Sequence, residues 1–337
     1  MRPLEHYLTP KQEALFEMLR EMHKGHVVSF CKKNYILVRG EAPVMLVAHL
    51  DTVHHEPVRE ICKTENGNIL MSPQGIGGDD RCGVYALNAV YEQSKIKPWL
   101  LFTCEEEVGG LGAEQFCLKH QGKKLPKELD DLKLLIEIDR KGKNDAVYYD
   151  CDNPEFEKYI TSKGFKTQYG SFTDISSIAP ELGMAAVNLS SGYYNAHTQH
   201  EYINRKHLNK TVQKVIEIVA ETTAPDFPKY EYIERVHSFN RKFGGYGGYD
   251  WYSDYYGYSA KSKSTKLNAA DEDDTEPKLE DVPDEILDEY IALLDFYTEE
   301  ELEDIRKEHG NAAISMLCQS EFGDDYYGMF GYDGDKV

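Results

Sequence analysis

The chain has 337 residues and a formal net charge of −21, because 59 Asp and Glu outnumber 38 Lys and Arg. This length fits about two domains, or one large α/β domain followed by a tail. The negative charge argues against a nucleic-acid-binding surface, which needs clustered basic residues, and against docking on anionic membranes. Residues 271–337 hold 23 acidic and 4 basic side chains, and the remaining residues carry only −2. We therefore expect a near-neutral body and a strongly acidic end.

The cysteines and the first residues bear on the compartment. The N-terminal sequence shows no apolar stretch of signal-peptide length, and no run approaches the roughly 18 apolar residues of a membrane-spanning helix. The seven cysteines are odd in number, widely scattered and without a CxxC pair. This pattern is typical of reduced thiols, and it argues against a disulfide framework or a cysteine-ligated zinc site. We expect a cytoplasmic protein.

Apolar runs and helical patterns alternate along most of the chain. An amphipathic helix is predicted first, over residues 10–23. Near-continuous apolar runs, typical of strands buried on both faces of a parallel sheet, follow at 44–49, 99–104, 132–139 and 184–190. Helical patterns lie between or after them at 81–95, 111–120, 154–163 and 206–222. This alternation predicts an α/β fold, a three-layer αβα sandwich around a mixed, mainly parallel sheet.

The regular pattern stops near residue 228, which we take as the end of a first folded domain spanning 1–228. Residues 229–283 are predicted to be a flexible linker, because they hold a Tyr/Gly-rich stretch and an acidic run. An acidic helical segment is expected over 284–337, with one helix at 284–297 and a shorter one ending at Gly310. Two interpretations stay open for this partly disordered extension: a module that binds a basic partner, or a solubilising tail.

Metal-ligand side chains recur where the predicted strands end. The segments are His49-Leu50-Asp51, Asp79-Asp80 in a glycine-rich turn, Glu105-Glu106-Glu107, Asp139, and the loop from His197 to Glu201. Each segment alone has an ordinary explanation, such as a helix cap or a solvated surface. Together they form a His/carboxylate set suited to zinc or a similar divalent ion, at the sheet edge where α/β proteins bind ligands. Of two adjacent glutamates, one can bind metal while its neighbour acts as a general base.

The order HLDTV, GGDDRCG, EEEVGG, EID, HTQHEY resembles the co-catalytic dinuclear zinc exopeptidases. This superfamily contains aminopeptidases, peptidase T-like tripeptidases and carboxypeptidase-like amidohydrolases. The resemblance covers roughly residues 40–205, and the motifs are specific as a set. It implies two divalent metal ions. Zn²⁺ is the expected metal, and Mn²⁺ and Co²⁺ are the alternatives.

The resemblance also implies a role for individual residues. The implied ligands are His49 and Asp139 on the first metal, Asp79 as the bridge, and Glu107 and His197 on the second. Glu106 would be the general base, and Asp51 would orient a ligand imidazole. A cis peptide bond is expected between Asp79 and Asp80.

The assignment of the last ligand and of the substrate contacts is more open. His200 competes with His197, although the register of H-x-x-x-E-Y-I favours the latter. Candidate substrate contacts are Thr173, Asp174, Tyr193, Tyr194 and His200. The Thr-Asp pair equally fits the N-cap of a helix over 174–181, and the tyrosines equally fit packing.

Spacing narrows the branch of the superfamily. Only 28 residues separate Asp51 from Asp79, too few for the lid domain that some members insert there. The step of 58 positions from Asp139 to His197 leaves no room for an inserted dimerisation domain. We expect an enzyme that cleaves amide bonds of short peptides as an aminopeptidase. The alternatives are an amidohydrolase, deacylase or carboxypeptidase acting on N-acyl amino acids or other small amides, and an inactive binding protein on this fold.

Overall fold

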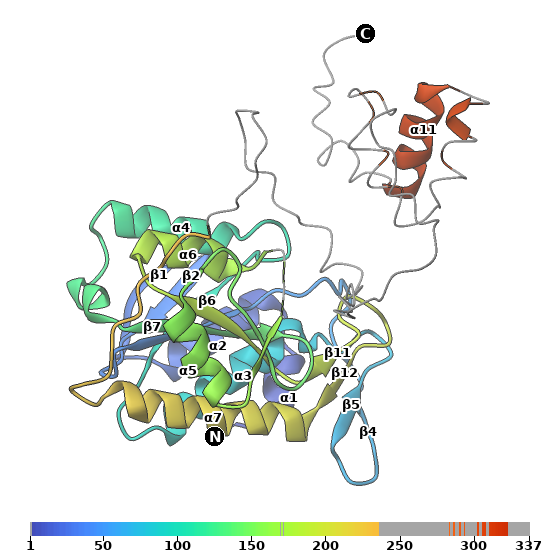
Figure 1. Cartoon of the computed structure of the whole chain (residues 1–337). Helices are drawn as coiled ribbons and strands as arrows, with labels where there is room; N and C mark the ends of the chain where they lie inside the picture. The colour runs from blue at the N-terminus through green and yellow to red at the C-terminus, as the bar shows by residue number, and fades with distance from the viewer. Residues whose placement is uncertain are drawn as a thin grey trace, which may run out of the picture. The chain divides into compact units, whose positions relative to one another are not determined.

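The computed structural model describes the body of the chain and part of its C-terminal segment (Figure 1). The described residues are 2–168, 170, 172–235, 283, 286, 290, 293, 302, 305–307 and 310–322. The chain divides into two compact units, residues 1–260 and residues 261–337. Every predicted site residue belongs to the first unit.

An eight-stranded mixed sheet forms the centre of the first unit, in the order β1-β2-β6-β3-β7-β10-β8-β9. The strands are β1 (Val27–Cys31), β2 (Tyr35–Val38), β3 (Val44–His49), β6 (Trp99–Thr103), β7 (Leu134–Arg140), β8 (Asp145–Val147), β9 (Lys166–Gln168) and β10 (Ala186–Ser190). The four central strands β6, β3, β7 and β10 pair in parallel. Every residue of β3, β6 and β10 is buried, which confirms the interpretation of their continuous apolar runs.

Helices cover both faces of this sheet (Figure 1). They are α1 (Glu5–Leu8), α2 (Gln12–Met22), α3 (Gly78–Gln93), α4 (Leu111–Gln121), α5 (Pro154–Ser162), α6 (Asp174–Leu182) and α7 (Arg205–Thr222). Alternate residues of β3 belong to two separate cores, with Leu46 in one and Val47 in the other. The first core includes residues of α2, α3 and α7, and the second includes residues of α4 and α6. The predicted three-layer αβα sandwich is therefore confirmed.

A small antiparallel sheet, which the sequence did not reveal, lies beside the first turn of α3. Its order is β11-β12-β5-β4, with β4 (Cys62–Lys63), β5 (Ile69–Met71), β11 (Tyr193–Tyr194) and β12 (Tyr202–Asn204). β11 and β12 pair as a hairpin, and the loop between them carries His197. The small sheet thus fixes both ends of the loop that carries His197.

The first residues of the predicted linker are described. Residues 229–235 pack on the first unit, because Glu231 and Glu234 bridge to Met184 and Cys151. The rest of the predicted linker, 236–282, lies outside the described residues. Of the predicted helix at 284–297, described residues 290 and 293 are helical. Gly310 is followed by a further helix that was not predicted, α11 (Asn311–Phe322).

Within the part of the chain that the structure describes, none of the helices is both long and apolar enough to span a bilayer.

Candidate metal centre

The predicted ligands come together at the carboxyl end of the central parallel strands, because successive strands of such a sheet end at the same edge. His49 is the last residue of β3, and Asp139 lies near the end of β7. Glu106 and Glu107 follow β6, and Asp79 lies in the first turn of α3. The peptide bond between Asp79 and Asp80 is cis, as the family resemblance implies.

The Asp79 carboxylate lies between two histidines and presents one oxygen to each. Its Oδ1 is 3.3 Å from Nε2 of His49, and its Oδ2 is 3.2 Å from Nε2 of His197. A carboxylate that faces two imidazoles in this way has the arrangement of a bridge between two cations.

The first side of the centre is completed by Asp139, whose Oδ1 lies 3.6 Å from Nε2 of His49. Its other oxygen accepts a hydrogen bond of 3.3 Å from Oγ1 of Thr173. The Tyr193 hydroxyl donates to its backbone carbonyl, and Oδ1 of Asn188 accepts from its backbone N–H. These contacts hold the Asp139 carboxylate in one orientation.

The second side consists of His197 and Glu107, with 3.2 Å between Nε2 and Oε2. Asp51 connects the two sides. Its Oδ2 accepts a hydrogen bond from the backbone N–H of Glu107, and its Oδ1 lies 3.2 Å from Nδ1 of His49. Through the Nδ1 contact, Asp51 orients the imidazole so that Nε2 points into the cluster.

The residues present fit a pair of divalent cations. Ligands that bind zinc tetrahedrally at 2.0–2.1 Å lie about 3.3 Å from each other, which is close to the separations found here. Among the described residues, Oδ1 of Asp139 and Oε1 of Glu107 are buried without a hydrogen-bond partner, which suits oxygens that would bind a cation. Two groups of ligand atoms lie within 4.8 Å of one another: His49 with Asp80 and Asp139, and His49 with Asp79 and Glu107.

The carboxylates of the cluster shift the pKa values of its members. Burial, followed by the charge of Asp79, raises the pKa of Asp139 to about 8. Burial opposes the charged form of His197, but the adjacent Asp79 and Glu107 outweigh it and raise its pKa to about 11. The clustered carboxylates therefore favour positive charge nearby, which divalent cations would supply.

Glu106 lies beside the ligands without being tied to them. Its Oε2 is 3.9 Å from Nε2 of His49, and its side chain is 12% exposed. Within the part of the chain that the structure describes, no residue donates a hydrogen bond to the Glu106 carboxylate. Burial raises its pKa well above the ordinary value. A carboxylate of this kind, to which none of the described residues donates a hydrogen bond, suits a general base.

Two acidic residues in the cluster were given no role from the sequence. Asp80 is fully buried, accepts a hydrogen bond from the backbone N–H of Gly83, and belongs to the group of His49 and Asp139. Glu201 is also fully buried and contacts the turn that carries Asp79. The available signal for Glu201 was its place in the motif, four residues after His197.

The predicted substrate contacts have other surroundings. Thr173 is the N-cap of α6, and Asp174, its first residue, is buried and accepts a hydrogen bond from the Thr103 hydroxyl. Tyr194 stacks on Tyr202 at 4.9 Å between ring centroids, and its hydroxyl contacts His207. His200 is exposed, whereas His197 reaches the cluster.

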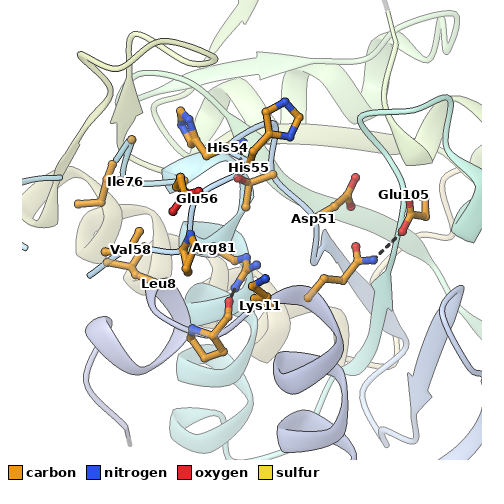
Figure 2. A pocket seen from close by; sticks show the side chains of 16 residues that line it. Leu8, Lys11, Asp51, His54, His55, Glu56, Val58, Ile76, Arg81 and Glu105 are labelled. Atoms are coloured by element: carbon orange, nitrogen blue, oxygen red, sulfur yellow. Dashed lines mark hydrogen bonds between the residues drawn. The ribbon is translucent and has the colours of Figure 1, made fainter. Parts of the chain in front are cut away.

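A pocket of about 280 Å³ adjoins the centre, and Asp51 belongs to both (Figure 2). The N-terminal segment, α3 and the loop after β3 form its walls, and Leu8, Lys11, His54, His55, Glu56, Val58, Ile76, Arg81 and Glu105 are among the residues that line it. Nη1 of Arg81 donates to the carbonyls of Tyr7 and Pro10, which holds the N-terminal segment in place. None of the residues predicted to contact substrate lines this pocket.

Comparison with known proteins bears on the fold. The chain is similar to the crystal structure of a tripeptidase from Staphylococcus aureus subsp. aureus Mu50, with 17% identity, a TM-score of 0.50, and coverage of 65% of this chain and 96% of that one. It is also similar to the aminopeptidase PepT from Bacillus cereus ATCC 10987, with 14% identity, a TM-score of 0.48, and coverage of 66% and 98%. No protein-family model and no curated protein sequence matches it. The chain thus shares the fold of the staphylococcal tripeptidase structure.

Proposed function

We propose that the chain is a metallo-exopeptidase, an aminopeptidase that hydrolyses amide bonds of short peptides with two divalent ions, Zn²⁺ first. The observation that carries this proposal is the Asp79 carboxylate between His49 and His197, with the unengaged Glu106 carboxylate beside them. A binding protein on the same fold would not need both a complete ligand set and a free base.

The ligands divide between two positions that share Asp79. His49 and Asp139 would hold one ion, and Glu107 and His197 the other. When bound, the ions would polarise the substrate carbonyl and lower the pKa of water. Asp51 keeps the His49 imidazole aimed at its position, and Thr173 does the same for the Asp139 carboxylate.

Glu106 performs the proton transfers. Its carboxylate would take the proton from the water that attacks the carbonyl carbon, and would then deliver it to the nitrogen of the amine that leaves. The raised pKa of Glu106 suits both steps, because the group must first accept a proton and afterwards hold it until the amide bond breaks.

Short peptides are the substrate class that the chain favours. The staphylococcal structure is that of a tripeptidase, which supports peptide substrates. Within 1–235, the chain between the metal-ligand motifs has no room for an inserted domain. A screen of peptides with free amino groups against N-acylated amino acids tests this choice. Turnover confined to the acylated compounds would point to a deacylase instead.

The test of the centre is Glu106→Gln, with the neighbouring Glu105→Gln as a matched control. We expect Glu106→Gln to retain about two metal ions per chain by elemental analysis and to lose 10²- to 10⁴-fold in kcat, the usual contribution of a general base. Glu105→Gln should keep most activity, because its carboxylate contacts Gln12 and no ligand. Full activity of Glu106→Gln would remove the general base from the mechanism, and a wild-type protein without affinity for zinc, manganese or cobalt would refute the centre.

A further inference from the structure

Glu201 is a fully buried carboxylate that accepts hydrogen bonds from three donors. Its Oε1 accepts from the backbone N–H of Asp79 at 2.9 Å. Its Oε2 accepts from the backbone N–H of Gly77 at 2.9 Å and contacts Nε2 of His54 at 2.8 Å. Both carboxylate oxygens are therefore engaged, and the hydrogen bonds are strengthened by the negative charge.

The turn that Glu201 contacts packs closely against the small sheet. Gly77 has a φ of 60°, a conformation that favours glycine. A Cβ atom on Gly78 would lie 2.7 Å from Cβ of Tyr193 and 2.9 Å from Cγ1 of Ile203. The backbone therefore passes close to the small sheet just before it reaches Asp79. The N–H groups on either side of Gly78 point at the same carboxylate.

Glu201 lies four residues after His197, in the loop between β11 and β12, near the start of β12. One side chain thus joins the loop that carries His197 to the turn that carries Asp79. These two residues approach each other to 3.2 Å, between Nε2 and Oδ2. The distance between them depends on how the loop and the turn are held together.

We infer that Glu201 is a positioning residue for the metal centre, which it serves by holding the backbone of Asp79 at a fixed distance from the His197 loop. This inference rests on the proposed dinuclear centre. Its contact with His54 extends the same network to the wall of the adjoining pocket. Glu201 touches no reacting atom in this scheme, and its effect reaches the metal through Asp79 and His197.

The experiment measures zinc affinity by competition with a chromogenic chelator, together with the melting temperature of the metal-free protein. The variants are Glu201→Gln and Glu201→Asp. Asn88→Ala is the control, because Asn88 is a buried residue of the same helix α3 whose hydrogen bonds go to His23 and to the carbonyl of Val84. It removes buried hydrogen bonds two turns beyond the centre.

We expect both Glu201 variants to bind zinc 10- to 100-fold more weakly, the usual effect of losing a partner of a metal ligand. In Glu201→Gln the side-chain amide NH₂ faces one of the two backbone N–H groups, so a donor meets a donor. In Glu201→Asp the side chain is too short to reach the N–H groups of both Gly77 and Asp79. Asn88→Ala should lower the melting temperature and leave zinc affinity unchanged. Excess zinc should restore kcat in both Glu201 variants, which a general loss of stability would not produce.

Unchanged zinc affinity in a folded Glu201→Gln or Glu201→Asp variant would overturn the inference while leaving the proposed function intact. An equal loss of affinity in Asn88→Ala would also overturn it, since the effect would then follow stability alone. A wild-type chain that binds no zinc would instead refute the centre itself.

Discussion

Replacing Asp174 by Asn should change how the stability of the metal-free protein depends on pH. Asp174 is fully buried at the start of α6, its Oδ2 accepts a hydrogen bond from Thr103, and its Oδ1 has no partner. Burial raises its pKa from 3.8 to about 6. Because the pKa is higher in the folded state, the protonated carboxyl stabilises the fold at low pH. That stabilisation is lost as pH rises from about 4 through 6.

The size of the effect follows from the shift. About 2.2 pKa units at 1.36 kcal/mol each correspond to about 3 kcal/mol of unfolding free energy lost between pH 4 and pH 7. Asn cannot ionise, so Asp174→Asn should gain about 3 kcal/mol relative to wild type over this interval. Burying the Asn amide costs the same free energy at every pH. It therefore displaces the whole curve of unfolding free energy against pH, and the expected change of about 3 kcal/mol along the curve stays the same.

Urea unfolding in the presence of a chelator, at half-unit steps of pH from 4 to 8, measures the difference directly. If the curves of Asp174→Asn and wild type were parallel, the carboxyl would not carry the raised pKa and the reasoning from its burial would be refuted.

Three further predictions concern the centre and the core. Thr173→Val removes the hydrogen bond to Asp139 and should weaken zinc binding 10- to 100-fold, as chelator competition would show; unchanged affinity would mean that the carboxylate needs no support. His197→Ala should lose the zinc ion that His197 and Glu107 would hold, whereas His200→Ala should keep it. Elemental analysis that showed the reverse would assign the ligand role to His200. Phe116→Ala empties part of the core under α4 and should lower the unfolding free energy by about 3–5 kcal/mol in urea; a loss below 1 kcal/mol would show that the site collapses.

The amino-acid sequence was sufficient for the central part of the fold. The runs at 44–49 and 99–104 are apolar at nearly every position, and strands buried on both faces require this pattern. The small strands were missed because two- and three-residue strands such as β4 and β5 leave no periodicity to detect. Their pairing depends on partners far away in the chain.

The same division applies to the centre. The ligand types and their order are local properties of the motifs, so His49, Asp79 and His197 could be proposed as ligands from the sequence alone. That the carboxylate of Asp79 faces both imidazoles, and that Glu201 joins its turn to the distant loop, depends on contacts between residues as far as 122 positions apart. Chemistry that resides in side-chain type can be read from a motif, whereas distances and orientations arise only when the sheet brings its strand ends together.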